Sequence, residues 1–317
     1  MKIPKIDNLK ITEVTNDLYL IHQIKQPYYF SCCDGLMLLP GERNDNSIIL
    51  DLNIEPEFVI KISKVIGYPS HYVCTHGHMD HIAHVHQWEK LGVKVLAPYP
   101  EHEYLLDLEK FFNGFGWNES LDFSFIKKFA KLNGYQPCTK ITSFLPGSSL
   151  KIENITIETI PLFGHSKAHT GFFLPDQKVL HISCLGFDQL EPGLNGFGPW
   201  YGFEECSIEQ YLKDIELTEK IFKEKSNFLT SSHSYVVSRS DFSPFEYMRN
   251  KINNNQLIVD QAILALKRKN LSVNINNLLD MDIFFPKKKM ESFRKSIWSF
   301  WESKILKKHL ERSKYID

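Results

Sequence analysis

Three imidazoles and one carboxylate fall within six consecutive residues of this sequence: His76, His78, Asp80 and His81. Imidazole and carboxylate ligands together favour a divalent metal of intermediate softness, such as zinc or iron, over calcium or magnesium. A lone His-x-His pair would be read more simply as a His-rich surface loop. Four ligand side chains clustered at the end of a strand indicate a metal site instead.

The flanking residues predict the elements that must position this loop. Residues 70–74 are rich in β-formers and predict a short strand, and Gly77 is expected to let the backbone turn sharply after it. Residues 56–66 and 80–92 each place apolar side chains on one helical face. Strands therefore alternate with helices over the first hundred residues, which is an α/β pattern.

The stretch Thr75-His76-Gly77-His78-Met79-Asp80-His81 resembles the signature of the metallo-β-lactamase superfamily. Residues 47–51 resemble the strand ending in Asp that precedes this signature, and residues 91–97 resemble the strand that follows it. The resemblance continues at the expected intervals to about Tyr235, roughly three quarters of the chain. It implies an α/β fold, the four-layered αβ/βα sandwich, here with a helical insertion and a C-terminal helical extension.

Three further ligands are implied by the resemblance, because the first loop has too few groups to close two metal sites. His165 lies in an element that resembles the family's Pro-Gly-His motif, although Phe163 precedes the glycine here. Cys184 stands where related hydrolases have a bridging Asp. A thiolate is a good zinc ligand, but a buried free Cys is also a common core residue, so both roles stay open. His233 follows a strand in a loop that lacks the family's glycines.

Two residues near these positions are weaker candidates for a role in the metal site. Asp188 could take the place of Cys184, but it lies four residues beyond the matching position. His169, four residues after His165, could support the site or bind substrate, and a core histidine is the simpler expectation.

The resemblance thus implies two metal sites with separate ligands: His76, His78 and His165 for the first, and Asp80, His81, His233 and Cys184 for the second. Two adjacent cations lower the pKa of a shared water towards about 7, so hydroxide forms at neutral pH. Asp80 is the expected catalytic residue, both a ligand and the group that orients this hydroxide. We expect two Zn²⁺ ions, with iron as the alternative, and hydrolysis of an ester, thioester, lactone or similar acyl bond.

Other functions remain open on the same fold. A non-haem iron oxidoreductase, or a protein similar to a persulfide dioxygenase, would use nearly the same ligands, although the soft sulfur of Cys184 favours zinc. A phosphodiesterase or nuclease, and a metal-binding protein without catalysis, are further alternatives. Cleavage of β-lactams is not favoured, because Phe187 stands where lactamases with a ligand Cys place a substrate-binding Lys.

The sequence suggests a main domain at residues 1–243 and a C-terminal helical extension at residues 244–317. Within the main domain, residues 104–146 predict a mostly helical insertion, and residues 41–46 predict a polar turn. The insertion carries several aromatic side chains: Phe111, Phe112, Phe115 and Trp117. They either belong to the core or form a cap over the metal cleft, which would favour a substrate with an apolar part.

The C-terminal extension combines an apolar stripe with a basic run. The stripe has a spacing of four residues, which predicts one helix: Phe293, Ile297, Trp301 and Ile305. Residues 287–314 are rich in Lys and Arg. A nucleic-acid contact is one interpretation, but a solvated basic face is the expectation, because charge runs usually face water.

Composition limits what can be expected of the protein's core, its partners and its location. The chain has 317 residues, 43% of them hydrophobic, with a formal net charge of −1, which is enough for one large core and gives no argument for nucleic acid or membrane. The six cysteines form no C-x-x-C pair or disulfide framework, and no apolar leader follows the first lysines. We therefore expect a cytoplasmic enzyme with a small-molecule substrate, and a homodimer stays open.

Overall fold

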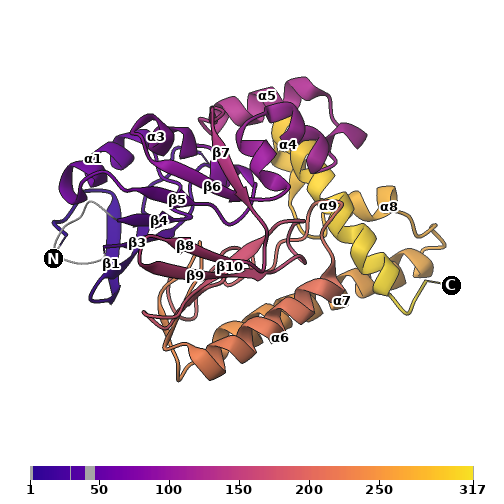
Figure 1. Ribbon diagram of the computed structural model, residues 1–317. Coiled ribbons are helices and arrows are strands. Elements are labelled where there is room, and N and C mark those ends of the chain that lie inside the picture. Colours follow the sequence, from indigo (N-terminus) through magenta and orange to yellow (C-terminus); the bar gives the residue numbers. More distant parts are fainter. Residues whose placement is uncertain (1–2, 29, 40–46, 317) are drawn as a thin grey trace.

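Two β-sheets lie face to face in the computed structural model, with helices on their outer faces (Figure 1). The structure describes residues 3–28, 30–39 and 47–316, so the polar turn expected at residues 41–46 lies outside the described residues. The first sheet pairs antiparallel from its first to its fourth strand and parallel from there on. In spatial order its strands are β1 (Leu9–Thr15), β2 (Leu18–Gln23), β3 (Gly35–Leu38), β4 (Ile48–Leu50), β5 (His71–Val73), β6 (Lys94–Pro98) and β7 (Ile141–Phe144).

The second sheet is also mixed. Its pairs are antiparallel except for β11 with β12, which is parallel. In spatial order its strands are β13 (Val237–Ser238), β12 (Phe228–Thr230), β11 (Val179–His181), β10 (Thr170–Leu174), β9 (Ile155–Pro161) and β8 (Ser149–Ile152).

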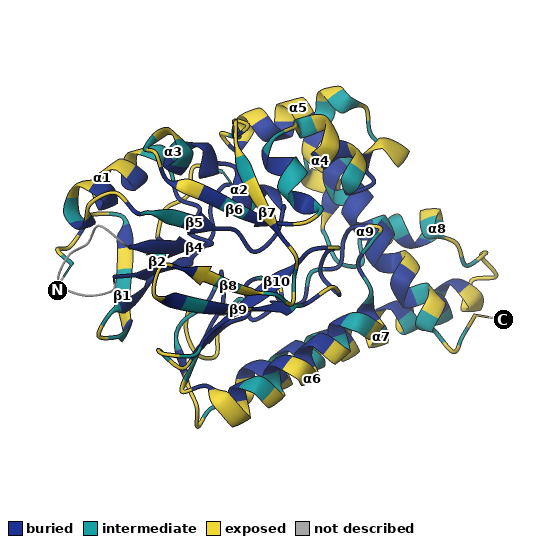
Figure 2. Ribbon diagram, viewed as in Figure 1, coloured by how far each residue is buried: buried dark blue, intermediate teal, exposed yellow. Residues whose placement is uncertain are grey.

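Apolar side chains alternate between the two faces of the first sheet. Leu18 and Leu20 of β2 belong to a buried cluster that also contains side chains of the second sheet, so they fill the space between the sheets. Tyr19 and Ile21 belong to the other large cluster, together with side chains of the outer helices. Because both faces are covered, the central strands are apolar throughout and almost wholly buried (Figure 2).

The outer helices complete the four layers that the sequence predicted. Helix α1 (Pro56–Ile66) spans the predicted residues and begins with Pro at its first turn, where the missing N–H costs nothing. Its apolar face is buried with side chains of the first sheet. Helix α6 (Ile208–Lys225) lies along the second sheet (Figure 1) and is capped by the Ser207 side chain, which accepts from the Gln210 N–H.

The helix predicted over residues 80–92 is divided into α2 (Met79–Ile82) and α3 (Val85–Lys90). The Asn53 side chain causes the division. Its Nδ2 donates to the Asp80 carbonyl, and its Oδ1 accepts the His84 N–H at 2.8 Å. In an unbroken helix these two backbone groups would bond to each other, so the amide takes over one i to i−4 hydrogen bond and ends α2.

The insertion is mostly helical, as predicted, in four short pieces: η2 (Glu101–Leu105), α4 (Leu108–Gly114), η3 (Trp117–Glu119) and α5 (Phe123–Leu132). The expectation is wrong for its last part, because residues 141–144 form β7 and pair with β6. The strand reads Ile-Thr-Ser-Phe, which is short and does not alternate between apolar and polar residues, so the sequence gives little signal for it. All four aromatic side chains named above are buried and belong to the main core cluster.

The C-terminal extension is helical: α7 (Ser243–Arg268), α8 (Ile275–Leu279), η4 (Lys287–Lys289) and α9 (Ser292–Arg312). Helix α9 returns to the insertion (Figure 1), where the Phe300 ring stacks on Trp117 with centroids 4.6 Å apart. Its predicted apolar stripe is buried. Within the described ranges, no helix is long and apolar enough to cross a membrane.

The basic face of α9 is only partly solvated, which corrects the expectation. Lys304 is buried and pairs with Glu119 of the insertion and with Glu204. Lys308 is buried and donates to the Phe203 carbonyl at 2.6 Å. These lysines therefore bind α9 to the segment around residue 204, a role that a count of basic residues does not reveal.

Candidate metal centre

The predicted ligands lie in loops that follow the carboxyl ends of strands in both sheets. In the first sheet, the loop after β5 carries His76 to His81. In the second sheet, strands β9, β11 and β12 run in one direction, and the segments after them carry His165, Cys184 and His233. These loops meet at one edge of the sandwich.

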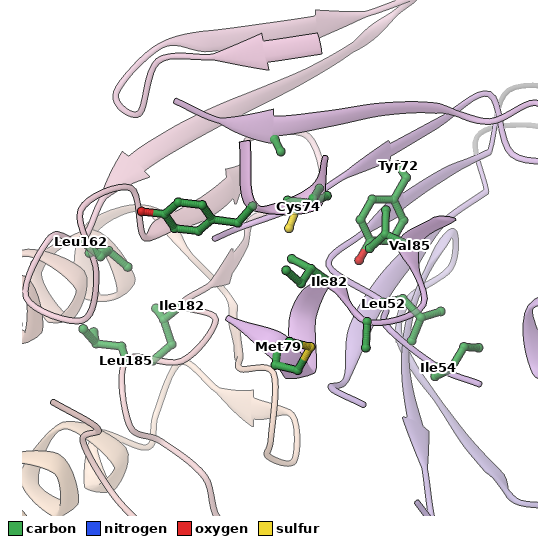
Figure 3. Close-up of a cluster of buried hydrophobic side chains, with 14 of the residues drawn as sticks. Leu52, Ile54, Tyr72, Cys74, Met79, Ile82, Val85, Leu162, Ile182 and Leu185 are labelled. Atoms are coloured by element: carbon green, nitrogen blue, oxygen red, sulfur yellow. The ribbon is translucent and has the colours of Figure 1, made fainter. Parts of the chain in front are cut away.

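The ligand loops pack against an apolar core (Figure 3). Met79 and Ile82 of α2 point into this core, and Leu162, Ile182 and Leu185 approach from the loops of the second sheet. All five side chains are buried. Close packing on both sides of the site limits how far the ligand loops can move relative to each other.

The first group of ligand atoms comes from His76, His165 and Cys184, whose Nε2, Nδ1 or Sγ atoms all lie within 4.8 Å of one another. The Nε2 atoms of His76 and His165 are only 3.2 Å apart. His78 lies beside them, with its ring centroid 4.5 Å from each of the other two imidazoles, although it is not part of the tight group. The structure therefore brings His76 and His165 together, with His78 beside them.

Hydrogen bonds fix the tautomers of the two close imidazoles. His165 Nδ1–H donates to the Trp200 carbonyl at 2.9 Å, which leaves Nε2 with a bare lone pair. His76 Nδ1 contacts Thr75 Oγ1, whose hydroxyl continues through Ser183 to the Asp51 carboxylate. A carboxylate only accepts, so with Ser183 donating to Asp51, Thr75 donates to Ser183 and accepts from His76 Nδ1–H. Its Nε2 is then bare as well.

Burial keeps the imidazoles of the first group in the form that binds metal. It lowers the pKa of His76 and His165 well below the usual range, and it lowers the pKa of His78 to about 3. Neighbouring histidines add to the effect on His76 and His165. All three rings are therefore neutral near pH 7, as metal coordination requires.

The second group contains Asp80, His81, Cys184 and His233. His81 Nε2 lies 2.9 Å from Cys184 Sγ, and Asp80 Oδ2 lies 3.2 Å from His233 Nε2. Cys184 Sγ belongs to both groups, so it lies between the two predicted sites and not only at the second. Asp80 and His233 keep 15% and 31% of their side chains exposed, so the second group opens to solvent while the first is closed.

The donor set fits metal ions. Two bare lone pairs 3.2 Å apart repel each other unless a cation lies between them, and His78 Nε2 is buried without a hydrogen-bond partner in the described part of the chain. Although burial opposes it, the Asp51 carboxylate raises the pKa of His81 well above its usual range, so these surroundings favour positive charge. Imidazole, carboxylate and thiol together suit zinc or iron.

Asp51 is a buried hub that the sequence identified only as the end of a resembling strand. Oδ2 accepts from His81 Nδ1 at 2.9 Å and from Ser232 Oγ at 2.9 Å, and Oδ1 accepts the Thr75 N–H at 3.1 Å. Burial opposes its ionisation, but His81 and His181 hold the pKa of Asp51 well below its usual range. The ionised carboxylate fixes the tautomer of His81 and so presents its Nε2 to the second group.

Two buried acids that the sequence reading missed hold the other loops. Asp214 of α6 accepts the Gly164 N–H at 2.7 Å, next to His165. Glu101 accepts backbone N–H groups from two loops, at Gly77 and at Ala168. Asp214 lies on the buried face of α6. An acidic residue among the apolar residues of a helical face could be recognised from the sequence. Glu101 stands in the polar run Glu101-His102-Glu103, where nothing in the sequence distinguishes it from its neighbours.

Gly77 is needed for space, and not for the sharp turn that the sequence suggested. It does not take a positive φ. A Cβ at this position would lie 2.5 Å from Tyr104 Cδ2 and 3.1 Å from Glu101 Cβ. The glycine lets the η2 turn pack directly on the backbone between two ligand histidines.

Asp188 and His169, the two residues with weaker claims to a place in the site, lie beside the centre but not in it. Asp188 accepts the Gly198 N–H and the Tyr247 hydroxyl, so it shapes a loop and does not replace Cys184. Both nitrogens of His169 are used by backbone groups, at Leu162 and Cys184, which makes it a structural neighbour. Phe187, which stands in place of the lactamase Lys, is buried.

The insertion closes the site instead of lining an open cleft. The Phe115 ring packs against His78 with centroids 4.7 Å apart, and Phe203 packs against the same imidazole at 4.8 Å. Both phenylalanines are buried. The insertion therefore shields the first group from water on this side.

No protein-family model and no curated protein matches this sequence. Solved structures do match it. A metallo-β-lactamase family protein from Thermus thermophilus superposes with a TM-score of 0.63 over 95% of this chain and 95% of that chain, at 14% identity. The metallo-β-lactamase FIM-1 from Pseudomonas aeruginosa, in its mono-zinc form, gives 0.53 over 79% and 97%, at 18% identity. A metallo-β-lactamase from Pontibacter korlensis gives 0.53 over 76% and 99%, at 16% identity. The chain has the metallo-β-lactamase fold.

Proposed function

We propose that this protein is a metal-dependent hydrolase that cleaves an ester, thioester, lactone or similar acyl bond. One observation carries the proposal. Loops from four strand ends bring six ligand-type side chains into two groups that share the Cys184 thiol, with His78 beside them. Buried acids hold these loops in place, which is the arrangement expected of a preorganised site.

The chain's own residues supply two sets of ligands. His76, His78 and His165 would hold a first cation, and Asp80, His81, His233 and Cys184 would hold a second, with zinc as the proposed metal. When bound, the cations lower the pKa of a water molecule and polarise the substrate carbonyl.

Asp80 is the proposed catalytic residue. It lies on the open side of the centre, beside His233. Burial opposes its ionisation, but His81 lowers the pKa of Asp80, so its carboxylate is ionised at neutral pH and can accept a hydrogen bond from the attacking water. Phe115 and Phe203 exclude solvent from the opposite side, which strengthens electrostatic interactions there.

The proposed substrate is a small molecule that approaches from the side of Asp80 and His233, where the centre is exposed. A panel of p-nitrophenyl acetate, a longer-chain p-nitrophenyl ester, a thioester and a lactone tests the reaction class. We expect hydrolysis of at least one of them by zinc-loaded protein and loss of that activity after chelation. Asp80→Asn should lower kcat by about 100-fold or more, as loss of a general base does.

Two results would change the assignment. Hydrolysis of bis-p-nitrophenyl phosphate, with all acyl substrates inert, would support a phosphodiesterase. Oxygen consumption that depends on added iron and a persulfide would support the iron oxidoreductase. Equal rates of acyl hydrolysis before and after complete removal of metal would contradict metal-dependent hydrolysis itself.

A further inference from the structure

Glu101 joins the two loops that carry the histidines of the first group. It is wholly buried at the start of η2. Its Oε2 accepts the Gly77 N–H at 2.6 Å, and its Oε1 accepts the Ala168 N–H at 2.8 Å. Gly77 lies between His76 and His78, and Ala168 follows His165 by three residues.

The two loops come from different sheets, so their spacing is not set by strand pairing. One loop follows β5 in the first sheet, and the other follows β9 in the second. A backbone hydrogen bond from the Thr170 N–H to the Thr75 carbonyl, 3.0 Å long, connects them at one point. Glu101 provides two more hydrogen bonds that connect them through a single side chain. Asp214, by comparison, holds only one of these loops.

Burying a carboxylate to link two segments carries an unfavourable desolvation free energy. Removing its charge from water is unfavourable unless strong hydrogen bonds compensate. Here each oxygen accepts one backbone N–H, and hydrogen bonds to an ionised acceptor are stronger than neutral ones. The result is a rigid fork, and Tyr104 packs over Gly77 from the same turn. Such a fork sets where the two loops lie.

We propose that Glu101 is a positioning residue for the first metal site, because it fixes the loop of His76 and His78 relative to the loop of His165. This inference rests on the proposed function. In the part of the chain that the structure describes, the hydrogen bonds of Glu101 go to backbone N–H groups and not to the ligand side chains. It acts through the backbone on either side, and it keeps the two Nε2 atoms at the separation that one cation can bridge.

Glu101→Gln is the sharpest test, because it preserves shape but replaces one acceptor oxygen by an NH₂ group. One backbone N–H then faces a donor, so one loop loses its anchor. Metal-free protein is titrated with Co²⁺ against a competing chelator, and the visible spectrum of each site is followed. We expect the first site to bind Co²⁺ about 10- to 100-fold more weakly, the usual effect of losing an outer hydrogen-bond partner.

Glu103→Gln is the matched control. Glu103 lies in the same turn but keeps 46% of its side chain exposed and pairs with Lys110. Its replacement should leave Co²⁺ affinity and spectrum unchanged. A lower melting temperature of metal-free Glu101→Gln with unchanged Co²⁺ affinity would reduce Glu101 to a structural residue and overturn the proposal.

Two further measurements keep the inference testable if Glu101→Gln does not fold. Glu101→Asp keeps the charge but is one methylene too short to reach both N–H groups, so it should also weaken the first site. In the wild-type protein, the Gly77 and Ala168 amides should exchange slowly with solvent, and fast exchange of either would contradict the fork. Wild-type protein that binds no Co²⁺ would instead contradict the proposed function.

Discussion

His76, His78 and His165 are buried and closely spaced, and their burial keeps all three imidazoles neutral. Burial penalises the charged imidazolium, so each ring has a free lone pair at neutral pH. Thr75 and Trp200 then fix which nitrogen carries the proton in two of the rings. The cluster is thus prepared to bind a cation by residues that are not ligands.

His78 gives the first prediction at this scale. His78→Ala should weaken the first metal site by more than the roughly 10- to 100-fold that loss of an outer partner costs, because a ligand itself is removed. Activity should be lost together with the metal, and the fold should survive, since His78 lies in a loop. Metal content by mass spectrometry and far-ultraviolet circular dichroism would measure both.

His84→Ala is the control for this variant. His84 is equally buried, and its nitrogens also lack partners in the described ranges, but it is outside the cluster. It should show the cost of deleting a buried imidazole without loss of metal. Native-like dichroism with undiminished metal content in His78→Ala would contradict the role of His78.

Cys184 gives the second prediction. If its thiolate binds metal, bound metal should protect it from alkylation by iodoacetamide, and chelation should expose it. Because Sγ lies between both groups, cobalt substitution should add a sulfur-to-cobalt charge-transfer band that Cys184→Ser lacks. Cys184→Asp should retain activity, since a carboxylate can also hold two cations.

The other cysteines provide an internal reference for the alkylation. Cys74, Cys138 and Cys206 are buried, and burial raises the pKa of each thiol, so they should react slowly whether metal is present or not. Equal binding of two metals by the Cys, Ser and Ala forms at position 184 would leave the second site to Asp80, His81 and His233 alone.

At the scale of elements, hydrophobic periodicity identified most strands and helices, but not where side chains interrupt them. The helix at residues 56–66 was predicted to its ends, because Pro56 and a clean apolar face mark it. The division of the helix at residues 80–92 depends on Asn53, which lies 27 residues before Asp80. The α8 helix is capped by Asn274 within a polar segment, where apolar spacing gives little signal. A local sequence pattern cannot reveal a distant partner such as Asn53, and it gives little signal for a short polar helix such as α8.

Helix α9 gives a prediction about pH. His309 is buried between Tyr201 and Gln256. Burial, aided by Arg312 and opposed by Asp260, lowers its pKa to about 3. The unfolded chain has the ordinary histidine pKa near 6.5 and binds the proton first. The stability contributed by neutral His309 is therefore complete above pH 6.5 and falls as the pH decreases towards 3, by about 1.4 kcal/mol for each pH unit at most.

The measurement compares metal-free wild type with His309→Gln by urea unfolding between pH 7.5 and pH 4.5. The difference in the free energy of unfolding should shrink as the pH falls, because only the wild type must bind an extra proton on unfolding. Working without metal removes the separate effect of protons on the ligand histidines. A difference that does not change with pH would show that His309 is not held neutral by its surroundings.

For the whole molecule, the family resemblance predicted the layered fold, and the structure confirms it. The resemblance includes the signature at residues 75–81, the strands on either side of it and elements that continue to about Tyr235. The seven ligands could be predicted because four of them lie in one signature of specific spacing and the resemblance implies His165, Cys184 and His233. Their support could not be named, because Glu101, Asn53 and Asp214 are ordinary polar residues until the chain folds.

The position of the extension also required the structure. The apolar stripe of α9 predicted that the helix packs, but it did not show the partner. Phe300 and Trp301 pack on Trp117 of the insertion, so a C-terminal helix covers a segment nearly two hundred residues earlier. Phe115 of the insertion and Phe203, which packs against Trp117 and Trp301, close the protected side of the metal centre.

The most direct test of the account is the number of metal ions that the folded chain binds. Metal-free protein is dialysed against a slight excess of Zn²⁺ and analysed for bound metal, with acyl hydrolysis measured on the same samples. We expect two Zn²⁺ ions per chain, and activity that rises as they bind. A folded protein that binds no divalent cation, and whose activity is the same with and without metal, would contradict it.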